Sequence, residues 1–358
     1  MAELLKDIYS VELINSIAKD CHQHYADFNN HGFIEEVLLD DWQDLELKQR
    51  MRRIAEVLGN YLPKNYKQAV DILLLVANNY SGLAHMCFPD FVELFGLDDF
   101  KTSMKALENL TEGSTSEFAI RAFIIRYPEK TMNQMKAWSS STNKHVRRLA
   151  SEGCRPRLPW SFALPEFKKD PQQVIKLIIP LIDDESLYVR RSVANNLNDI
   201  SKDNPTKVIA VAEEYLGQSK NIDWVIKHAC RGLLKKGDPK VLALFGYSKA
   251  DHLVIKQFEF DKQVKLGAKQ NFKFEMYSNK DNLGKLRIEF IIGFMKANGK
   301  RSEKIFKITE GEYAESQKTV SKYFSFKPIS TRKYYLGVHD LFIVINGIKV
   351  RQVTFDLI

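Results

Sequence analysis

The sequence predicts a multidomain protein with an all-α part followed by an all-β part: an α-α superhelix over residues 1–250 and a small β-sandwich over residues 251–358. Three observations carry this prediction. At 358 residues the chain is too long for one ordinary hydrophobic core. Its first 250 residues place apolar residues at helical spacing between short polar breaks. From about Leu253 apolar and polar residues alternate, as they do in strands.

Residues 1–250 are predicted to form a series of helices. The strongly apolar segment at 66–80 is the clearest of them. Four more follow in quick succession, at 170–181, 186–200, 205–216 and 221–236. Pro205 and Pro239, each preceded by Asn or Asp, stand where one helix is expected to stop and another to start.

Three segments of this half are copies of one unit. They begin at His145, Tyr188 and Trp224 and align without gaps. Their starts lie 43 and 36 residues apart, which is in the range of HEAT-like two-helix repeats. In the middle copy one helix face carries an apolar stripe, formed by Val189, Val193, Leu197 and Ile200.

The opposite face of each copy is polar, and its residues lie four apart: Arg148 and Glu152; Arg191, Asn195 and Asp199; Lys227, Arg231 and Lys235. Stacked repeats place equivalent columns side by side, so we expect one polar strip along a concave surface. A single pair such as Arg148–Glu152 is also what an ordinary surface salt bridge looks like. The recurrence in three copies favours a binding surface.

Residues 251–358 are predicted to form strands. The clearest element is an Asn346-Gly347 pair between two apolar runs, because both residues of a tight hairpin turn need positive φ. About seven strands over this length suit an immunoglobulin-like sandwich. The segment lacks the Cys-Trp-Cys pattern of antibody domains.

The net charge of +8 is unevenly distributed. Residues 251–358 contain 20 Lys and Arg against 12 Asp and Glu, whereas the first 250 residues contain 33 of each sign. Residues 136–157 form a local basic stripe, with 6 bases and 1 acid. A basic stripe and a basic appended domain are what a phosphate-binding protein needs, although ordinary solvated lysines would give the same counts.

No apolar run approaches the roughly 20 residues that span a bilayer, and the N-terminus does not resemble a secretion signal. The four cysteines are scattered without CxxC spacing. The cysteine pattern favours reduced thiols in a cytoplasmic protein with no metal site. We also expect no cofactor and, from the lack of a long apolar run, no membrane partner.

The segment from Ser114 to Trp160 is where chemistry is expected. Glu117 and Arg121 lie four apart, as on one helix face, and a Ser or Thr at 114–116 is suited to cap that helix. After Gly153 two prolines hold the chain extended up to Trp160. A rigid loop with two arginines and a terminal tryptophan is an unusual helix connection. The alternative is that Trp160 fills the core between repeats.

Three stretches resemble the AlkC branch of the HEAT-like-repeat alkylpurine DNA glycosylases. They are Phe95-Gly-Leu-Asp-Asp-Phe, Ser114-Thr-Ser-Glu-Phe-Ala-Ile-Arg, and His145-Val-Arg-Arg-Leu-Ala-Ser-Glu-Gly-Cys-Arg-Pro-Arg-Leu-Pro-Trp. The resemblance covers most of residues 1–250, and family members with a C-terminal immunoglobulin-like domain fit the remainder. Ala122 and Cys154 depart from the family pattern, where proline and threonine are expected. Neither replaces a charged residue.

The resemblance implies a monofunctional glycosylase of base excision repair that hydrolyses the N-glycosidic bond of cationic alkylated bases. The expected lesion is 3-methyladenine, with 3-methylcytosine and 7-methylguanine as further candidates. The expected partner is double-stranded DNA containing such bases. The enzyme is expected to be a bacterial monomer, cytoplasmic and associated with the nucleoid when engaged.

Specific residues are expected to carry this chemistry. A methylated base is already a good leaving group, so the enzyme needs negative charge near the sugar and a carboxylate that orients water. We assign Glu117 and Glu152 to these roles, with Asp199 in support, and Trp160 to contact the lesion or its sugar. The predicted DNA-binding residues are Arg121, Arg148, Arg155, Arg157, Arg190, Arg191, Asn195, Lys227 and Arg231. The basic C-terminal domain is expected to close over the duplex from the other side.

Two other functions compete with this one. Helical-repeat arrays are commonly protein scaffolds, and arginines alone would suit a DNA binder that does not cut. A protein scaffold would place apolar or mixed columns on the concave face, whereas this face carries arginines, lysines and isolated acids. Acids beside a polyanion are electrostatically costly, which favours catalysis over a DNA binder that does not cut. The sequence leaves open the lesion preference, the extent of base flipping, the dominant carboxylate and the oligomeric state.

Overall fold

The computed structural model describes residues 4–330 and 332–358. By its internal contacts the chain divides into two compact units. The first contains residues up to 208 together with 214–229, and the second contains 209–213 together with 230–358. The boundary of the domains at residue 250 remains a prediction. No described helix is long and apolar enough to cross a membrane.

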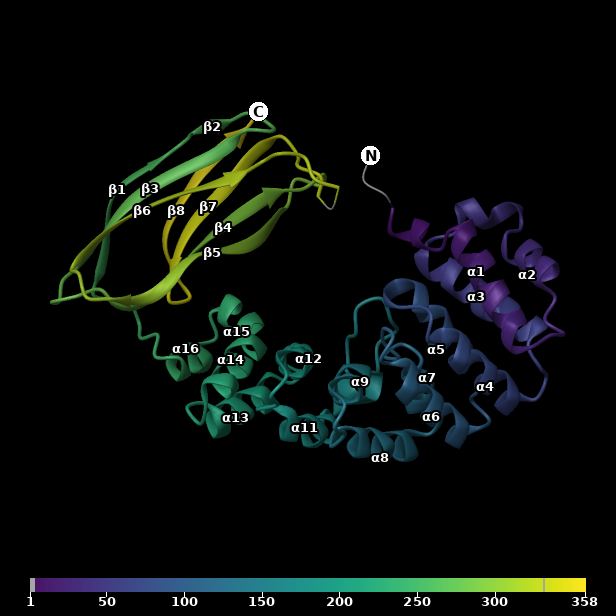
Figure 1. Cartoon of the computed structure of the whole chain (residues 1–358). Coiled ribbons are helices and arrows are strands. Elements are labelled where there is room, and N and C mark those ends of the chain that lie inside the picture. The colour runs from purple at the N-terminus through teal and green to yellow at the C-terminus, as the bar shows by residue number, and fades with distance from the viewer. Residues whose placement is uncertain (1–3, 331) are drawn as a thin grey trace. The chain divides into compact units, whose positions relative to one another are not determined.

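Helices make up the first unit (Figure 1). In chain order they are α1 (Val11–His24), α2 (Asn30–Val37), α3 (Leu47–Tyr61), α4 (Tyr66–Ala77), α5 (Cys87–Phe95), α6 (Phe100–Leu110), α7 (Ile120–Arg126), α8 (Pro128–Trp138), α9 (Lys144–Gly153), α10 (Pro165–Lys169), α11 (Gln172–Ile178), α12 (Leu187–Ile200), α13 (Pro205–Tyr215), which runs through the division, and α14 (Lys220–Ala229). Short 3-10 turns lie between them: η1 (Leu5–Ile8), η2 (Asp40–Asp44), η3 (Gly82–Met86) and η4 (Ile179–Leu181).

Two of the predicted helices are interrupted. The helix predicted at 170–181 starts at Gln172 and changes to a 3-10 turn at Ile179, because Pro180 has no N–H to continue the α-helical ladder. The helix predicted at 221–236 breaks at Cys230 into α14 and α15. Arg231 and Lys235 therefore do not continue the helix that carries Lys227.

The three repeat copies lie on α9, α12 and α14, and α12 packs against both of the others. All four residues of the predicted apolar stripe on α12 are buried. The prediction of stacked helical copies is confirmed in this respect. The stacking brings the polar residues of α9 and α12 next to each other.

The second unit begins with two short helices, α15 (Arg231–Lys236) and α16 (Pro239–Leu244), and continues with strands. These are β1 (Leu253–Phe260), β2 (Gln263–Val264), β3 (Lys269–Ser278), β4 (Gly284–Met295), β5 (Arg301–Tyr313), β6 (Gln317–Ser325), β7 (Gly337–Ile345) and β8 (Ile348–Leu357). One sheet has the order β1-β3-β6 and the other the order β2-β8-β7-β4-β5. All pairs are antiparallel except β2 with β8.

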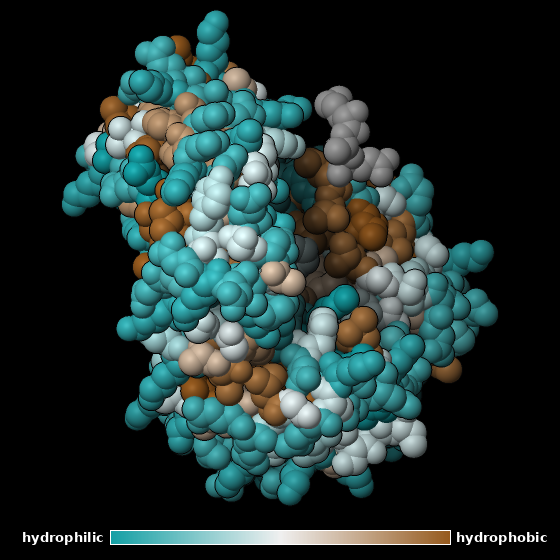
Figure 2. Space-filling model, turned by 90° about the vertical axis from the view of Figure 1, so that its left-hand side faces the viewer, coloured by the Kyte–Doolittle hydropathy of each residue, from teal (hydrophilic) through white to brown (hydrophobic). Residues whose placement is uncertain are grey.

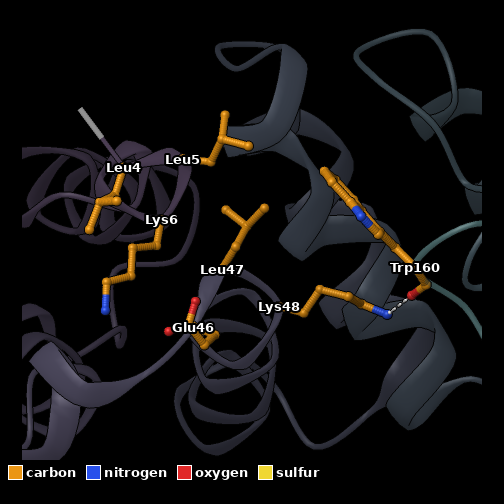
Figure 3. Close-up of a pocket in the computed structure, with 7 residues that line it drawn as sticks. All are labelled: Leu4, Leu5, Lys6, Glu46, Leu47, Lys48 and Trp160. Carbon is orange, nitrogen blue, oxygen red and sulfur yellow. Dashed lines mark hydrogen bonds between the residues drawn. The ribbon is translucent and has the colours of Figure 1, made fainter. Parts of the chain in front are cut away.

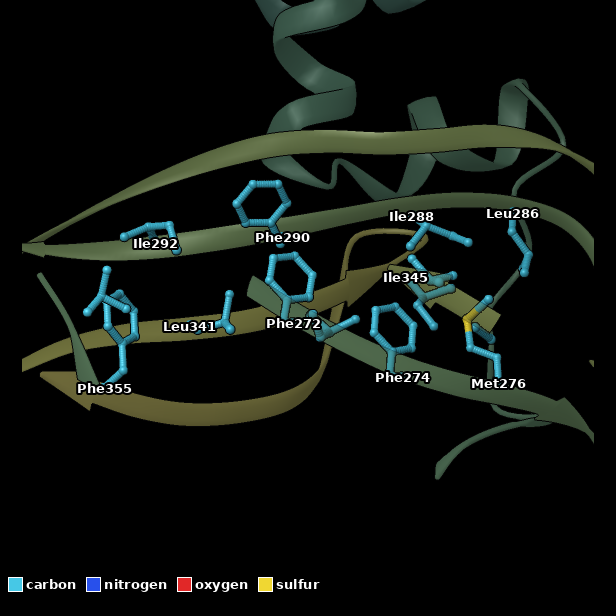
Figure 4. Packing of buried hydrophobic residues seen from close by; sticks show 14 of the residues in the cluster. Phe272, Phe274, Met276, Leu286, Ile288, Phe290, Ile292, Leu341, Ile345 and Phe355 are labelled. Atoms are coloured by element: carbon cyan, nitrogen blue, oxygen red, sulfur yellow. The ribbon is translucent and has the colours of Figure 1, made fainter. Parts of the chain in front are cut away.

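The two sheets enclose one apolar core. Alternate residues of β3 point towards side chains of the other sheet (Figure 4), and the rings of Phe272 and Phe290 lie 5.1 Å apart between centroids. The predicted β-sandwich is confirmed, with eight described strands instead of about seven.

The predicted Asn346-Gly347 turn joins β7 to β8. Its two residues have φ of 46° and 80°, both in the left-handed region. The Asn346 side chain accepts a hydrogen bond from the Arg287 backbone N–H and donates one to the Ser248 carbonyl oxygen. Gly347 is close to the backbone of Gly237: a Cβ at position 347 would lie 2.9 Å from its Cα. The turn therefore requires glycine for two reasons.

Candidate active site

Arg121 holds the loop after α9 in place through hydrogen bonds to its backbone. Its guanidinium, fully buried on α7, donates to the carbonyl oxygens of Gly153 at 2.9 Å and Arg155 at 2.8 Å, and also to that of Phe162. Burial lowers the pKa of Arg121 to about 10. We predicted Arg121 as a DNA contact, and this prediction is corrected: a guanidinium enclosed by loop carbonyls does not reach a phosphate.

Glu117 lies in a turn before α7 and not on the helix, which begins at Ile120. The predicted common helix face with Arg121 is therefore wrong, and α7 has no side-chain cap from residues 114–116. The turn instead lets the Thr115 hydroxyl donate to Glu117 Oε2 at 2.7 Å. Arg148, on α9, donates to the same oxygen and to Thr115 Oγ1. The turn fixes the direction of the carboxylate.

Arg148 also joins Glu117 to Glu152. Its Nη2 lies 3.4 Å from Glu152 Oε1, one helical turn along α9. Burial opposes the charge of Arg148, but the two glutamates outweigh burial and raise its pKa. The guanidinium also lies 5.2 Å from the ring centroid of Tyr188, at the start of α12. Arg148 is thus a largely buried cation that contacts two carboxylates.

Arg155 continues the series from Glu152 to Asp199. Its Nη1 lies 2.6 Å from Glu152 Oε1, and its Nη2 lies 2.8 Å from Asp199 Oδ2 on the neighbouring helix α12. Lys202 then pairs with Asp199 Oδ1 at 2.9 Å. Three acids and three cations thus alternate in one connected chain, which we call the charge chain: Glu117, Arg148, Glu152, Arg155, Asp199 and Lys202.

The three carboxylates differ in how completely they are bonded. Both oxygens of Asp199 accept from cations. Glu152 Oε1 faces the two arginines, and its Oε2 accepts from the Ser192 hydroxyl at 2.6 Å. Glu117 Oε1 has no hydrogen-bond partner among the described residues, and Glu117 is the most exposed of the three, although only 10% of its side chain is accessible. Within the charge chain, Glu117 Oε1 thus remains available to a further hydrogen-bond donor.

Trp160 lies on the surface, within the loop between α9 and α10. Its side chain and backbone are 57% exposed, so the alternative that it fills the core is excluded. Its φ of 64° lies in the left-handed region, which a bulky residue rarely adopts. Lys48 of α3 donates to the Trp160 carbonyl oxygen at 2.8 Å (Figure 3). The same ammonium lies 4.9 Å from the ring centroid of Phe118, next to Glu117.

The remaining predicted DNA contacts are scattered. Arg157 pairs with Asp203 at 2.6 Å, and Arg190 donates to the carbonyl oxygens of Asp184 and Glu185. Asn195 Oδ1 lies 3.2 Å from His228 Nε2. Arg191 and Lys227 are exposed on α12 and α14, and Arg231 lies on α15.

Sequence reasoning missed five side chains of this site: Lys48, Thr115, Tyr188, Ser192 and Lys202. Thr115, Tyr188 and Ser192 lie in segments that the sequence pattern identifies, but a hydroxyl or a ring gives no signal of its role. Lys48 is 112 residues from Trp160, so only the folded chain brings the two together. Within the described residues no group of three or more His, Cys, Asp or Glu is arranged to hold a metal ion.

Two family models match the chain. Residues 111–233 match one described as DNA alkylation repair enzyme, and residues 254–358 match the C-terminal Ig-like domain of the uncharacterised protein YhaZ. The first match contains every residue of the charge chain. The second contains all of the described strands except the first residue of β1.

Two whole-length relatives extend these matches. An uncharacterized protein YhaZ of Bacillus subtilis (strain 168) is 47% identical over 345 residues, covering 96% of each chain. An alkylpurine DNA glycosylase AlkC of Pseudomonas fluorescens, solved bound to DNA containing an abasic site analogue, is 35% identical with a TM-score of 0.95. The alignment covers 99% of this chain and 100% of that one. Both units of the fold therefore have counterparts in one solved protein.

Proposed function

This chain belongs to the AlkC-type family of DNA alkylation repair glycosylases, and on that premise we propose that it removes cationic alkylated bases from double-stranded DNA by hydrolysis of the N-glycosidic bond. The proposed lesion is 3-methyladenine, with 7-methylguanine and 3-methylcytosine as further candidates. The observation that carries the proposal is the charge chain, which holds three acids together largely withdrawn from water. Its Arg155 lies in the same loop as the exposed Trp160.

The chemistry of the lesion explains this choice of side chains. Methylation at a ring nitrogen places positive charge on the base, so the base leaves without protonation by a strong general acid. Positive charge then develops on the sugar in an oxocarbenium-like transition state. Carboxylates that are fixed in advance near that charge stabilise it, because they need no reorganisation during the reaction.

We assign different roles to the three acids from their hydrogen bonds. Glu117 has one carboxylate oxygen without a protein partner, so it is the acid that orients the attacking water. Glu152 and Asp199 are already bonded at both oxygens and contribute their charge. Trp160 contacts the lesion or its sugar, and an indole face attracts a cationic base.

The arginines of the charge chain serve the carboxylates in this proposal. Arg148 and Arg155 lie between the three acids and offset their mutual repulsion in a largely buried site, which the acids alone could not tolerate. The phosphate contacts then come from exposed cations of the predicted set, foremost Arg191 and Lys227.

Release of methylated bases from methylated duplex DNA tests the proposal. We expect the intact protein to release them and Glu117→Gln to be slower by about 10²-fold or more, as on loss of one electrostatic stabiliser. Glu129→Gln on α8 is the matched control, because Glu129 is exposed and lies outside the charge chain. DNA binding by the intact protein without any base release would overturn the enzymatic proposal in favour of a non-catalytic DNA binder.

A further inference from the structure

A hollow of about 450 Å³ lies beside Trp160 (Figure 3). Its lining comes from three separate parts of the chain: the start of the described residues, the beginning of α3 and the loop after α9. The lining residues are Leu4, Leu5, Lys6, Glu46, Leu47, Lys48 and Trp160. The volume falls within the usual range of small-molecule pockets, about 300–1,000 Å³.

The lining is apolar and faces water. Leu4 and Leu5 are each 62% exposed, and the 3-10 turn that carries Leu5 contributes no buried residue. Figure 2 shows hydrophobic surface gathered on one face among mainly hydrophilic side chains. Exposed apolar surface of this kind, rimmed by polar groups, is typical of a binding site. In Figure 3 the side chains of Leu5, Leu47 and Trp160 lie around the same space.

Trp160 is held in this position by the backbone and by a cation. A tryptophan at φ of 64° is uncommon, and such conformations concentrate at functional sites. Lys48 anchors the Trp160 carbonyl oxygen and leaves two of its three N–H groups for another acceptor. Lys6 uses one N–H for the Gln43 carbonyl oxygen and is in the same situation. The rim thus offers donors for an anion beside an aromatic wall.

The hollow and the charge chain differ in the charge of the ligand group that each favours. Two lysines against one glutamate make the rim of the hollow positive, which favours a phosphate. An apolar floor and an exposed indole suit a flat neutral ring, because bases of any sequence stack on aromatic side chains. The hollow and the carboxylates therefore suit different parts of the same DNA.

We propose that this hollow receives an undamaged, unstacked nucleotide of the bound DNA, with its neutral base against the part of Trp160 that lines the hollow and its phosphate at Lys48 and Lys6, while the lesion or its sugar contacts Trp160 outside the hollow. The proposal rests on the proposed function, since it assumes DNA bound at the charge chain. It adds a subsite for normal DNA to the site for the lesion. Bending or opening the duplex at the lesion would supply such a base.

Photo-cross-linking tests the proposal with the full-length protein. The probe is a duplex with a stable abasic-site analogue, in which 5-iodouracil stands opposite the site or on either side of it. Irradiation of this base joins it to an aromatic side chain in contact, and peptide mass spectrometry identifies the residue. We expect a cross-link to Trp160 from at least one of the three positions.

A pair of variants shows whether the hollow itself holds the base. Leu5→Asp places a charge in the apolar lining and is expected to lower the Trp160 cross-link about fivefold or more. Ile8→Asp is the control, because Ile8 is exposed on the same 3-10 turn and does not line the hollow. Equal cross-linking in both variants, or no cross-link to Trp160 from bound DNA, would overturn the proposal.

Base release measured in parallel separates this proposal from the previous one. Release from methylated DNA without a Trp160 cross-link overturns the nucleotide subsite alone. A Trp160 cross-link that depends on Leu5, without any base release, supports the subsite and overturns the glycosylase proposal. Absence of both overturns both proposals.

Discussion

Arg155 bonds two largely buried carboxylates, so its loss leaves negative charge without compensation. We expect Arg155→Gln to lower the free energy of unfolding by about 3–5 kcal/mol, the usual cost of breaking a buried ion pair from one side. Urea denaturation of the variant and the parent protein measures the difference. Arg157→Gln is a matched control in the same loop: its pair with Asp203 is more exposed, and its loss should cost less than about 1 kcal/mol. Equal losses for both variants would contradict this account.

The sequence predicts which residues form the site better than it predicts the contacts between them. Glu117, Glu152, Asp199 and Trp160 were selected from motif resemblance and repeat columns, and the fold places the three acids in one chain with Trp160 in the loop after α9. Spacing along the sequence gave the Arg148–Glu152 pair, which is i,i+4. It did not give the contact of Arg155 with Asp199, 44 residues away. Such pairs depend on how two helices stack, which no local pattern encodes.

At the scale of elements, Gly347 shows how closely the last hairpin approaches the helices that precede the strands. We expect Gly347→Ala to destabilise the second unit by about 1–3 kcal/mol, because the added Cβ meets the Gly237 backbone. Gly299→Ala is the control: Gly299 also has positive φ in a hairpin turn, 73°, but its Cβ would enter open space. Thermal unfolding measures both losses of stability, and the amount by which the loss in Gly347→Ala exceeds that in Gly299→Ala gives the cost of the contact with the Gly237 backbone. Equal losses of stability in the two variants would mean that the backbone moves to accept the added Cβ without loss of stability.

The packing of α3 against α5 makes the stability of the folded protein depend on pH. Burial raises the pKa of Asp90 on α5 to about 7, against the opposing influence of Arg52 on α3. The folded protein then binds a proton that the unfolded chain has already lost above its ordinary pKa of about 4. The stability contributed by this group is therefore lost as the pH rises from about 4 to about 7.

The variant Asp90→Asn isolates this titration from others in the chain. We expect the unfolding free energy of the variant, relative to the parent, to rise between pH 5 and pH 7.5 by on the order of 1–4 kcal/mol. Thermal melts of both proteins across this range provide the measurement. A constant difference across the range would show that Asp90 is ionised throughout.

Most elements were predictable because their patterns are local. The hairpin at Asn346-Gly347 and the apolar stripe of α12 follow directly from residue type and spacing. The breaks at Pro180 and Cys230 and the turn conformation of Glu117 were not predicted. In the last case the serine and threonine residues suggested a helix cap, whereas Thr115 bonds the neighbouring carboxylate instead.

At the scale of the whole molecule, the basic second unit predicts a salt effect on DNA binding. The turn between β4 and β5 carries Lys296 and Lys300, both exposed. If these lysines contact phosphates, replacing both with Gln lowers the slope of log K against log salt by up to about 0.9 for each contact. Lys280→Gln is the control, because the adjacent Asp281 leaves that turn without net charge. An unchanged slope in the double variant would exclude this turn from the interface.

The four cysteines, Cys21, Cys87, Cys154 and Cys230, are all buried and unpaired. Burial raises the pKa of Cys21, Cys154 and Cys230 to about 12, and that of Cys87 further. At neutral pH these thiols carry almost no thiolate, the form that electrophiles attack. Methylating agents modify nucleophilic sulfur as well as DNA bases. The burial therefore has a consequence for how long the enzyme stays intact: a repair enzyme of this kind keeps its own thiols out of reach of the reagents that create its substrates.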